Sequence, residues 1–282
     1  MTQIAALPHR ALIGFAGPDW AKFLQGQSTI NLDKIMADVE VGRLNQLYYA
    51  AFLTPQGKMI TDAFIYTVSA EEAWLDIPRD LRDEMFTRLN LYKLRAKITL
   101  SKLDNPVFVA FGGPLPAGFS EDPRAAIIGQ GGQLGLSYKP QIATAELSAW
   151  IDYRLPHGLS DPVFDYPREY MYPIDANLDL LEAIDFKKGC FVGQETTSRM
   201  KRRGQIKNRI LPLKVTVDAP FETEVLNGER RAGEVLAAQA PRALGLMRLD
   251  RIDGALTVSG QSAMLDIPDW LQPHIAIANP AG

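Results

Sequence analysis

The last third of the chain consists of short apolar runs separated by turn residues, a pattern that restricts it to small antiparallel β-structures. These runs follow Ile206 and cover residues 209–217, 233–237, 243–249 and 255–259. Asn227-Gly228 lies between the first two runs and is typical of a two-residue hairpin turn. Short strands at this spacing predict a small β-barrel or β-sandwich over residues 206–282.

The first hundred residues mix strands with helices. An apolar run at residues 10–15 leads into Gly17-Pro18-Asp19, where proline suits the first turn of a helix that we expect to end at Gly26. Two β-rich runs, 48–53 and 59–68, are joined through the turn Thr54-Pro55-Gln56-Gly57 and predict a hairpin. This region therefore predicts an α+β unit.

The middle of the chain is less regular. Glycine and proline cluster between residues 105 and 135, which predicts a loop-rich connection. Asn177 is a candidate cap of a short helix, and a second helix is expected from Gly193 to Arg203, ended by Gly204. We therefore predict three parts: an N-terminal α+β module at 1–104, a middle α+β module at 105–205 and a C-terminal β-barrel at 206–282.

Composition and charge are those of an ordinary globular protein. The chain is 46% hydrophobic and 22% charged, with a net charge of -3, so it has no large field that would attract a nucleic acid or a membrane. Its longest apolar stretch, which includes residues 48–53, is far shorter than the roughly 18 residues of a membrane-spanning helix. The first ten residues show no secretory signal. We expect no membrane partner and a location in the cytoplasm or in the matrix of an organelle, with the cytoplasm as the first expectation.

Cys190 is the only cysteine, and it lies between Lys188-Gly189 and Gly193. A neighbouring ammonium group and the start of a helix would both favour its thiolate, and the flanking glycines would allow a ligand or partner to approach closely. The alternative is a small buried hydrophobic residue. One thiol and three histidines form no CxxC or HxxxH pair, so we expect no metal site within the chain. Any metal centre that Cys190 ligates would then have to be shared with a partner.

A basic run follows, because residues 199–209 hold six lysines and arginines. Such a run predicts a site for an anion: the carboxylates of a folate tail, RNA phosphates or an acidic protein. A solvated helix face is the alternative. The run contains no aromatic residue on which a base could stack, so a nucleic acid bound through residues 199–209 is the less favoured partner.

The segment around Cys190 resembles the signature of a known family. Asn177-Leu178-Asp179-Leu180-Leu181, followed by Lys188-Gly189-Cys190-Phe191-Val192-Gly193-Gln194-Glu195 and by Arg199 and Arg203-Gly204, is similar to the motif of the YgfZ family, a branch of the folate-binding, glycine-cleavage T-protein-like superfamily. Phe23-Leu24-Gln25-Gly26-Gln27 and residues 53–58 resemble further family segments. The likeness covers most of the chain and is weakest from 105 to 150.

The resemblance implies a fold and a function. The fold is an α+β, glycine cleavage T-protein-like ring of modules with a C-terminal β-barrel, around a central cavity that can hold tetrahydrofolate or a derivative. The function is a role in assembling or maintaining iron–sulfur proteins, including radical-SAM enzymes that modify tRNA. The implied partners are folate and iron–sulfur assembly proteins or client enzymes. Besides the functional thiol of Cys190, the residues implied for cofactor binding are Lys188, Gly189, Gly193, Gln194, Glu195, Arg199, Arg203, Gln25 and Asp175.

Two departures from the superfamily bear on catalysis. Aminomethyltransferases carry paired aspartates in the strand that matches residues 59–68, whereas this chain has Thr61-Asp62. Their pterin-anchoring glutamate corresponds to Pro156, which offers neither a carboxylate nor an N–H group. We therefore expect an accessory protein that is stabilised by tetrahydrofolate. The alternatives are a tetrahydrofolate-dependent aminomethyltransferase that works near Asp62, and an RNA-binding module.

Overall fold

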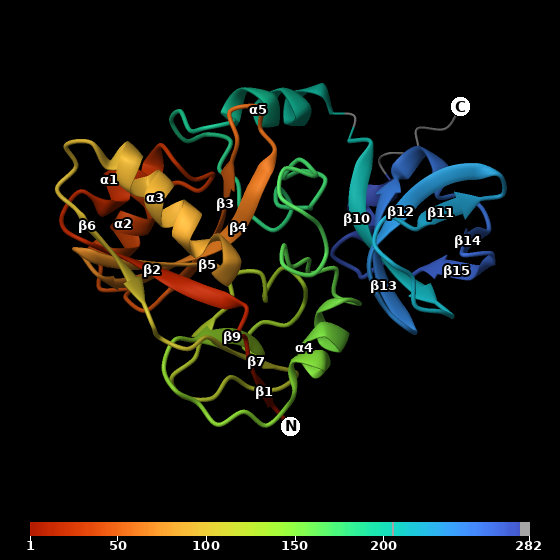
Figure 1. Cartoon of the computed structure of the whole chain (residues 1–282), viewed down its shortest axis with the longest axis horizontal. Coiled ribbons are helices and arrows are strands. Elements are labelled where there is room, and N and C mark those ends of the chain that lie inside the picture. Colours follow the sequence, from red (N-terminus) through yellow and green to blue (C-terminus); the bar gives the residue numbers. More distant parts are fainter. Residues whose placement is uncertain (205, 277–282) are drawn as a thin grey trace.

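The computed structural model describes residues 1–204 and 206–276, which form three β-structured units around a common centre (Figure 1). The first unit is a five-stranded antiparallel sheet in the order β3-β4-β5-β2-β6. Its strands are β2 (Arg10–Ala16), β3 (Leu47–Leu53), β4 (Met59–Ser69), β5 (Glu72–Pro78) and β6 (Thr99–Leu103). The predicted strand at 10–15 and the predicted hairpin are confirmed.

One face of this sheet is covered by helices. They are α1 (Trp20–Gln25), α2 (Leu32–Glu40), the short 3-10 helix η1 (Arg79–Leu81) and α3 (Arg82–Lys93). Their buried side chains, such as Leu24, Ile35 and Met85, form one apolar core with Phe15 and Leu75 of the sheet. The helix predicted to end at Gly26 is confirmed as α1. The opposite face of the sheet is therefore free to face the centre of the molecule.

A four-stranded antiparallel sheet forms the second unit, in the order β1-β7-β9-β8. Its elements are β1 (Gln3–Ala6), β7 (Phe108–Phe111), β8 (Ser120–Glu121), β9 (Leu134–Ser137) and the helix α4 (Leu147–Arg154) that packs beside it. Gln3 pairs with Phe111 across the β1–β7 ladder. The first strand of the chain thus lies in the same sheet as residues 108–137, and the division of the first 205 residues into two modules stays a prediction.

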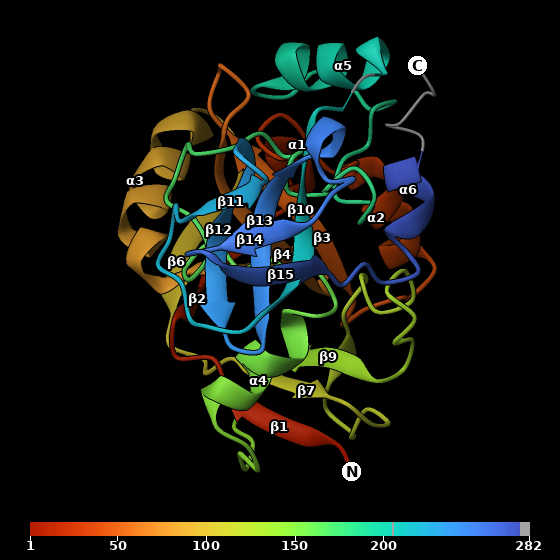
Figure 2. The same ribbon diagram turned by 90° about the vertical axis from the view of Figure 1, so that its right-hand side faces the viewer.

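The third unit is a closed barrel of six strands, in the order β10-β13-β12-β11-β14-β15. Figure 2 looks onto it, with the other two units behind. Its elements are β10 (Asn208–Val215), β11 (Glu224–Asn227), β12 (Arg230–Gln239), β13 (Arg242–Arg248), η2 (Leu249–Arg251), β14 (Leu256–Val258), β15 (Gln261–Leu265) and α6 (Gln272–Ala276). The barrel is confirmed and the sandwich alternative is wrong. The prediction missed β15, where Ala263 is the only fully buried residue.

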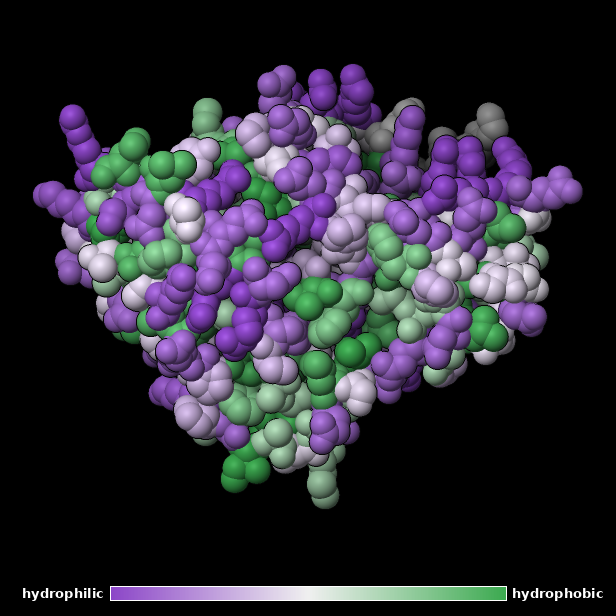
Figure 3. All heavy atoms as spheres, in the orientation of Figure 1, coloured by the Kyte–Doolittle hydropathy of each residue, from purple (hydrophilic) through white to green (hydrophobic). Residues whose placement is uncertain are grey.

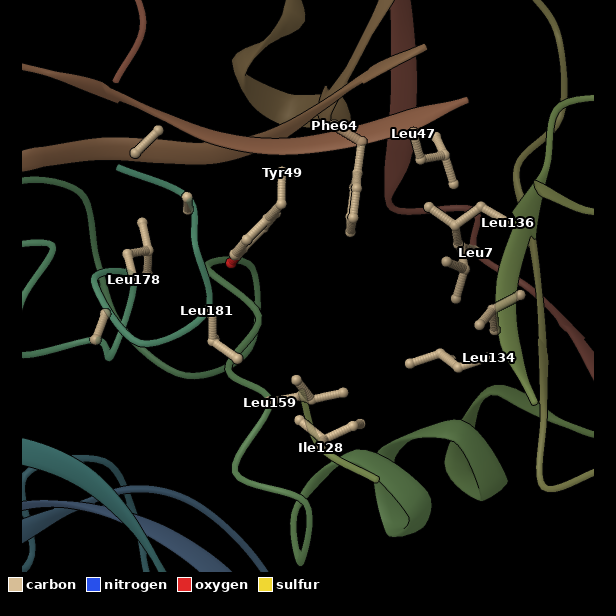
Figure 4. Close-up of a cluster of buried hydrophobic side chains, with 14 of the residues drawn as sticks. Leu7, Leu47, Tyr49, Phe64, Ile128, Leu134, Leu136, Leu159, Leu178 and Leu181 are labelled. Carbon is tan, nitrogen blue, oxygen red and sulfur yellow. The ribbon is translucent and has the colours of Figure 1, made fainter. Parts of the chain in front are cut away.

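The three units share a central core. Figure 4 shows side chains such as Leu7, Tyr49, Phe64 and Leu136 pointing toward one another from both sheets, and Leu181 approaching from the segment before α5 (Gln194–Arg203). Barrel residues Ile210, Leu236 and Leu244 join the same cluster. Apolar burial therefore fixes how the units sit against one another. None of the described helices is both long and apolar enough to cross a bilayer.

The predicted short helix after Asn177 is wrong. Residues 173–182 form successive turns, and Asn177 has a left-handed backbone with φ of 62°. Its side-chain amide donates 2.8 Å to the carbonyl of Ile210, the third residue of β10. Asn177 therefore ties this segment to the barrel and caps no helix.

Candidate functional site

Cys190 lies on a loop that we call the thiol loop, residues 185–193, which leads directly into α5. Cys190 is exposed and forms no disulfide. Gly189 beside it is also exposed, while Lys188 and Phe191 on either side are buried. The interpretation of Cys190 as a buried hydrophobic residue is therefore wrong, and the loop presents its thiol to solvent.

The ammonium group of Lys188 is bound by backbone carbonyls at the end of α1 and just after it. Its ammonium group donates three hydrogen bonds to the backbone carbonyls of residues 25, 28 and 30, over 2.7, 2.7 and 2.6 Å. Burial lowers the pKa of Lys188 to about 8, so the amine stays mostly protonated at neutral pH. Because an ammonium group has three N–H donors, none is left for a cofactor. Lys188 is therefore an anchor of the thiol loop in this structure, and its role in cofactor binding stays a prediction.

Other contacts hold the thiol loop to the same stretch after α1. The amide of Asp185 donates to the carbonyl of Thr29 over 3.0 Å, and the amide of Val192 donates to the carbonyl of Gly26 over 3.2 Å. Gln25, a predicted cofactor residue, uses its side chain within this stretch, where its amide oxygen accepts from the Leu32 amide over 2.7 Å. The predicted residues Gln25 and Lys188 are thus brought together, and both serve to position the loop.

Gly193 ends the thiol loop by packing against the tip of the β3–β4 hairpin. It has a φ of 82°, and an added Cβ would lie 2.7 Å from the carbonyl oxygen of Thr54 and 3.0 Å from the Cα of Gly57. Two backbones therefore touch where α5 begins, above the hairpin in Figure 1. Gly193 was predicted to let a ligand or a partner approach closely. In the structure, the segment that approaches it is the β3–β4 hairpin of the same chain.

This contact distinguishes the two glycines that flank Cys190. Gly193→Ala is expected to cost about 2–4 kcal/mol of stability, because the left-handed backbone and the clash with Thr54 add up. Gly189→Ala is the matched control, since a Cβ there meets no atom within 4 Å, and its effect should stay within about 0.5 kcal/mol. Urea unfolding of both variants measures the difference. Similar losses in the two variants would contradict the packing described for Gly193.

The outer face of α5 is basic and exposed. Arg199, Arg202 and Arg203 are exposed, and Figure 3 shows hydrophilic side chains gathered over this helix. Within residues 1–204 and 206–276 none of these three arginines makes an ion pair with a carboxylate. An open hollow of about 450 Å³ lies along the helix, lined by Phe186, Gln194, Glu195, Ser198, Lys201 and Arg202. The predicted residues Gln194 and Glu195 therefore line one hollow with Phe186 of the thiol loop, and Arg199 and Arg203 are exposed on the same helix.

Two members of the basic run, Arg209 and Lys201, are paired with a carboxylate of the chain and are less available to a ligand than the exposed arginines. Arg209 is buried, and its guanidinium lies 3.0 Å from the Asp179 carboxylate. Lys201 also pairs with Asp179, over 3.1 Å. The interpretation of the whole run 199–209 as an anion site therefore narrows to the exposed arginines of α5 and the exposed Lys207, and Gln205 falls outside the described residues.

Asp175, another predicted cofactor residue, is buried and does not line the hollow along α5. One carboxylate oxygen accepts a hydrogen bond from the Tyr172 amide over 3.2 Å. Its backbone carbonyl accepts from the amide of Ile210 over 2.8 Å. Burial raises the pKa of Asp175 to about 6. Asp175 therefore connects the turn at 172–175 to the barrel.

Asp175→Asn is expected to raise stability by about 1–2 kcal/mol at pH 7, since it removes a buried charge and keeps the acceptor. The folded pKa lies above the unfolded value of about 4, so the wild-type protein should lose stability as the pH rises from about 4 to 6. The variant should lose this slope. Asp179→Asn is the control and should destabilise, because Asp179 pairs with Arg209 and Lys201. Melting temperatures across pH 4–8 test both, and a lower stability of Asp175→Asn would contradict the burial argument.

Asp62 lies far inside the molecule, on β4, in a pocket of only about 30 Å³. Its two carboxylate oxygens accept from the Tyr49 hydroxyl over 2.7 Å and from Arg10 over 3.4 Å. A space of this size holds about one water molecule, whereas a folate carries a two-ring pteridine. The residues around Asp62 therefore do not fit a folate, and this carboxylate is not free to act as a base.

A larger cavity, of about 470 Å³, opens elsewhere, between η1, the segment 162–168 and the barrel residue Phe221. None of the predicted site residues lines it. Sequence reasoning also missed Arg124 and Asp122 beside the Asp62 pocket. They fall in the glycine- and proline-rich stretch 105–135, where no periodic pattern marks a residue as buried.

The fold and the barrel have counterparts among known proteins. Residues 207–273 match the family model described as the CAF17 C-terminal β-barrel domain. The aminomethyltransferase T of the glycine cleavage system from Bartonella henselae superposes with a TM-score of 0.71 at 15% identity, covering 94% of this chain and 84% of that one. The fold is therefore α+β and glycine cleavage T-protein-like, with a C-terminal β-barrel.

Three similar proteins are named as iron-sulfur cluster assembly factor IBA57 or its homologue. The homologue from Mycosarcoma maydis is 29% identical over 75% of this chain and 57% of its own length, and that from Pyricularia oryzae is 32% identical over 73% and 56%. The Mus musculus protein is 28% identical over 94% of this chain and 84% of its own length. This chain thus spans less than two thirds of the two fungal relatives.

These names also bear on location. All three relatives are called mitochondrial. The expectation of a cytoplasmic location is therefore wrong by this comparison, because it rested on composition and on the first ten residues alone. The label of the YgfZ family stays a prediction.

Proposed function

We propose that this protein is an accessory factor in the assembly or maintenance of iron–sulfur proteins. The observation that carries the proposal is the exposed thiol of Cys190 on a loop whose neighbouring polar groups are used for internal anchoring. The relatives named as iron-sulfur cluster assembly factors support it. An anchored loop that exposes a single sulfur is suited to contact with a partner protein through that sulfur.

The cluster would be cargo shared between two proteins. Iron–sulfur clusters are held mostly by four thiolates, and this chain contains one cysteine. Within residues 1–204 and 206–276, no group of three or more metal-ligating side chains is found. Cys190 would supply one ligand, and an assembly protein or a client enzyme would supply the others. The exposed arginines of α5 would favour an acidic surface on that partner. Radical-SAM enzymes that modify tRNA are the client class that the YgfZ resemblance suggests.

The enzymatic alternative, and the folate ligand expected for the accessory protein, have less support. The aminomethyltransferase-like fold is the argument for a folate ligand, and the small, filled pocket at Asp62 is the argument against it. No feature of α5 adds a base-stacking surface, which also leaves the RNA-binding module without a specific observation in its favour. The proposed function therefore needs neither aminomethyl transfer nor RNA.

A complementation experiment tests the proposal. Cells that lack the homologous assembly factor would receive this protein, addressed to the compartment where that factor works. The activity and iron content of a [4Fe–4S] enzyme should recover, while an enzyme without a cluster should not change. Recovery of neither iron content nor activity, with the protein present at normal levels, would refute the accessory role.

A further inference from the structure

The pocket at the centre of the molecule contains a planar cation that belongs to the chain itself. We propose that the guanidinium of Arg124 acts as an internal ligand, which occupies the slot beside Asp62 and excludes a reduced folate from it. This inference is independent of the iron–sulfur role, because it concerns the interior between the two sheets and not the thiol loop.

Aromatic rings and a carboxylate surround the guanidinium of Arg124, as they would surround a bound cationic ligand. Its guanidinium carbon lies 4.5 Å from the ring centroid of Tyr49 and 4.8 Å from that of Phe64. Two of its nitrogens donate to the carboxylate of Asp122, over 2.7 and 3.0 Å. Stacking of a planar group on aromatic rings together with a paired carboxylate is the geometry that recognises a guanidinium or another planar amidine. The side chain of Arg124 supplies that group from within.

The neighbouring carboxylates are satisfied as well. Arg10 donates to Asp76 over 2.8 Å and to Asp62 over 3.4 Å. The remaining oxygen of Asp76 accepts from the Tyr138 hydroxyl over 3.1 Å, and that of Asp62 accepts from the Tyr49 hydroxyl. Each carboxylate oxygen of Asp62 and Asp76 thus has a donor within the chain. A pteridine that entered would have to displace Arg124 and leave Asp122 buried without its partner, which is costly.

The small volume that is left in the pocket is consistent with Arg124 occupying the slot beside Asp62. The pocket lined by Arg10, Asp62, Phe64, Asp122, Arg124 and Trp150 measures about 30 Å³. The side chains of Arg124 and Asp122 are 6% and 1% exposed. The superfamily fold is therefore retained while its centre has become a charged core that stabilises the contact between the two sheets.

The first test uses 5-formyltetrahydrofolate as the probe. At millimolar concentrations of this folate, the wild-type protein should show no rise in melting temperature that depends on Asp62, and crystals grown with it should show Arg124 still stacked on Tyr49. Density for a pteridine ring between Tyr49 and Asp122 would overturn the proposal. A rise in melting temperature that persists in Asp62→Asn would place the folate outside the central pocket and would support the proposal.

The second test removes the internal ligand. Arg124→Ala should lower the melting temperature by roughly 10 °C, because it leaves Asp122 as a buried, unpaired charge. Methylguanidinium at about 20 mM, where its denaturing effect is small, should restore part of the loss, and methylammonium should not. Arg199→Ala, on the exposed face of α5, should respond to neither. If Arg124→Ala does not fold, Arg124→Lys serves instead and should be less stable than wild type. An unchanged melting temperature, or equal rescue by both cations, would refute the role of Arg124.

Discussion

Cys190→Ala is expected to yield a folded protein that no longer restores iron–sulfur enzyme activity in cells. The side chain of Cys190 is exposed, so its removal leaves no cavity, and the melting temperature should change by no more than about 2 °C. The activity should fall to the level of cells without the factor, because the sulfur is the one thiol that this chain can offer to a cluster. Thermal unfolding and the complementation assay measure the two effects separately.

Cys190→Ser provides the matched control for shape. A hydroxyl has nearly the same size as the thiol but binds iron poorly in place of a soft thiolate ligand. We therefore expect Cys190→Ser to fail in the complementation assay as Cys190→Ala does, whereas Gly189→Ala on the same loop should retain most of the activity. Full activity of Cys190→Ala would remove the thiol from the proposed mechanism and leave the arginines of α5 as the remaining functional feature.

Lys188→Met is expected to destabilise the protein by about 3–5 kcal/mol, because three backbone carbonyls would lose their donor at once. Methionine keeps most of the length of the side chain, so the loss reports hydrogen bonds and not an empty space. Urea unfolding gives the free energy, and the melting temperature should fall by roughly 10 °C.

Lys187→Met is the control for Lys188→Met. Lys187 is adjacent, exposed and equally charged, so its replacement should change the stability by less than about 0.5 kcal/mol. If the two variants had the same stability, the ammonium of Lys188 would not be anchoring the thiol loop. The expectation that a neighbouring ammonium group favours the thiolate of Cys190 would then gain support.

Local patterns predicted the elements that depend on local interactions. Turn residues at short intervals indicated the barrel, and glycines at both ends indicated α5, which does begin after Gly193 and end before Gly204. The helix expected after Asn177 is absent from the structure, because the side-chain amide of Asn177 donates a hydrogen bond to the carbonyl of Ile210 instead of capping a helix. A partner 33 residues away in the sequence overrode the local capping preference.

The position of the candidate site could be predicted from the sequence, but the role of each residue within it could not be predicted. The motif around Cys190 correctly drew attention to an exposed thiol, yet it gave no indication of the direction in which Lys188 points. That direction depends on carbonyls about 160 residues earlier in the chain, since Lys188 and Gln25 are 163 positions apart. That Arg124 fills the central pocket could not be predicted for the same reason. Arg124 contacts Tyr49 and Phe64 only after both sheets have formed.

The anchoring of the thiol loop also sets an order of events during synthesis. Residues 25–30 and the hairpin tip at 54–57 leave the ribosome long before the thiol loop, which must dock onto them. A nascent chain thus displays its thiol correctly only once the first sheet has folded. In the mature protein the same dependence makes the loop and the first unit one cooperative unit in hydrogen exchange. A substitution that loosens α1 would therefore misplace the sulfur without touching it.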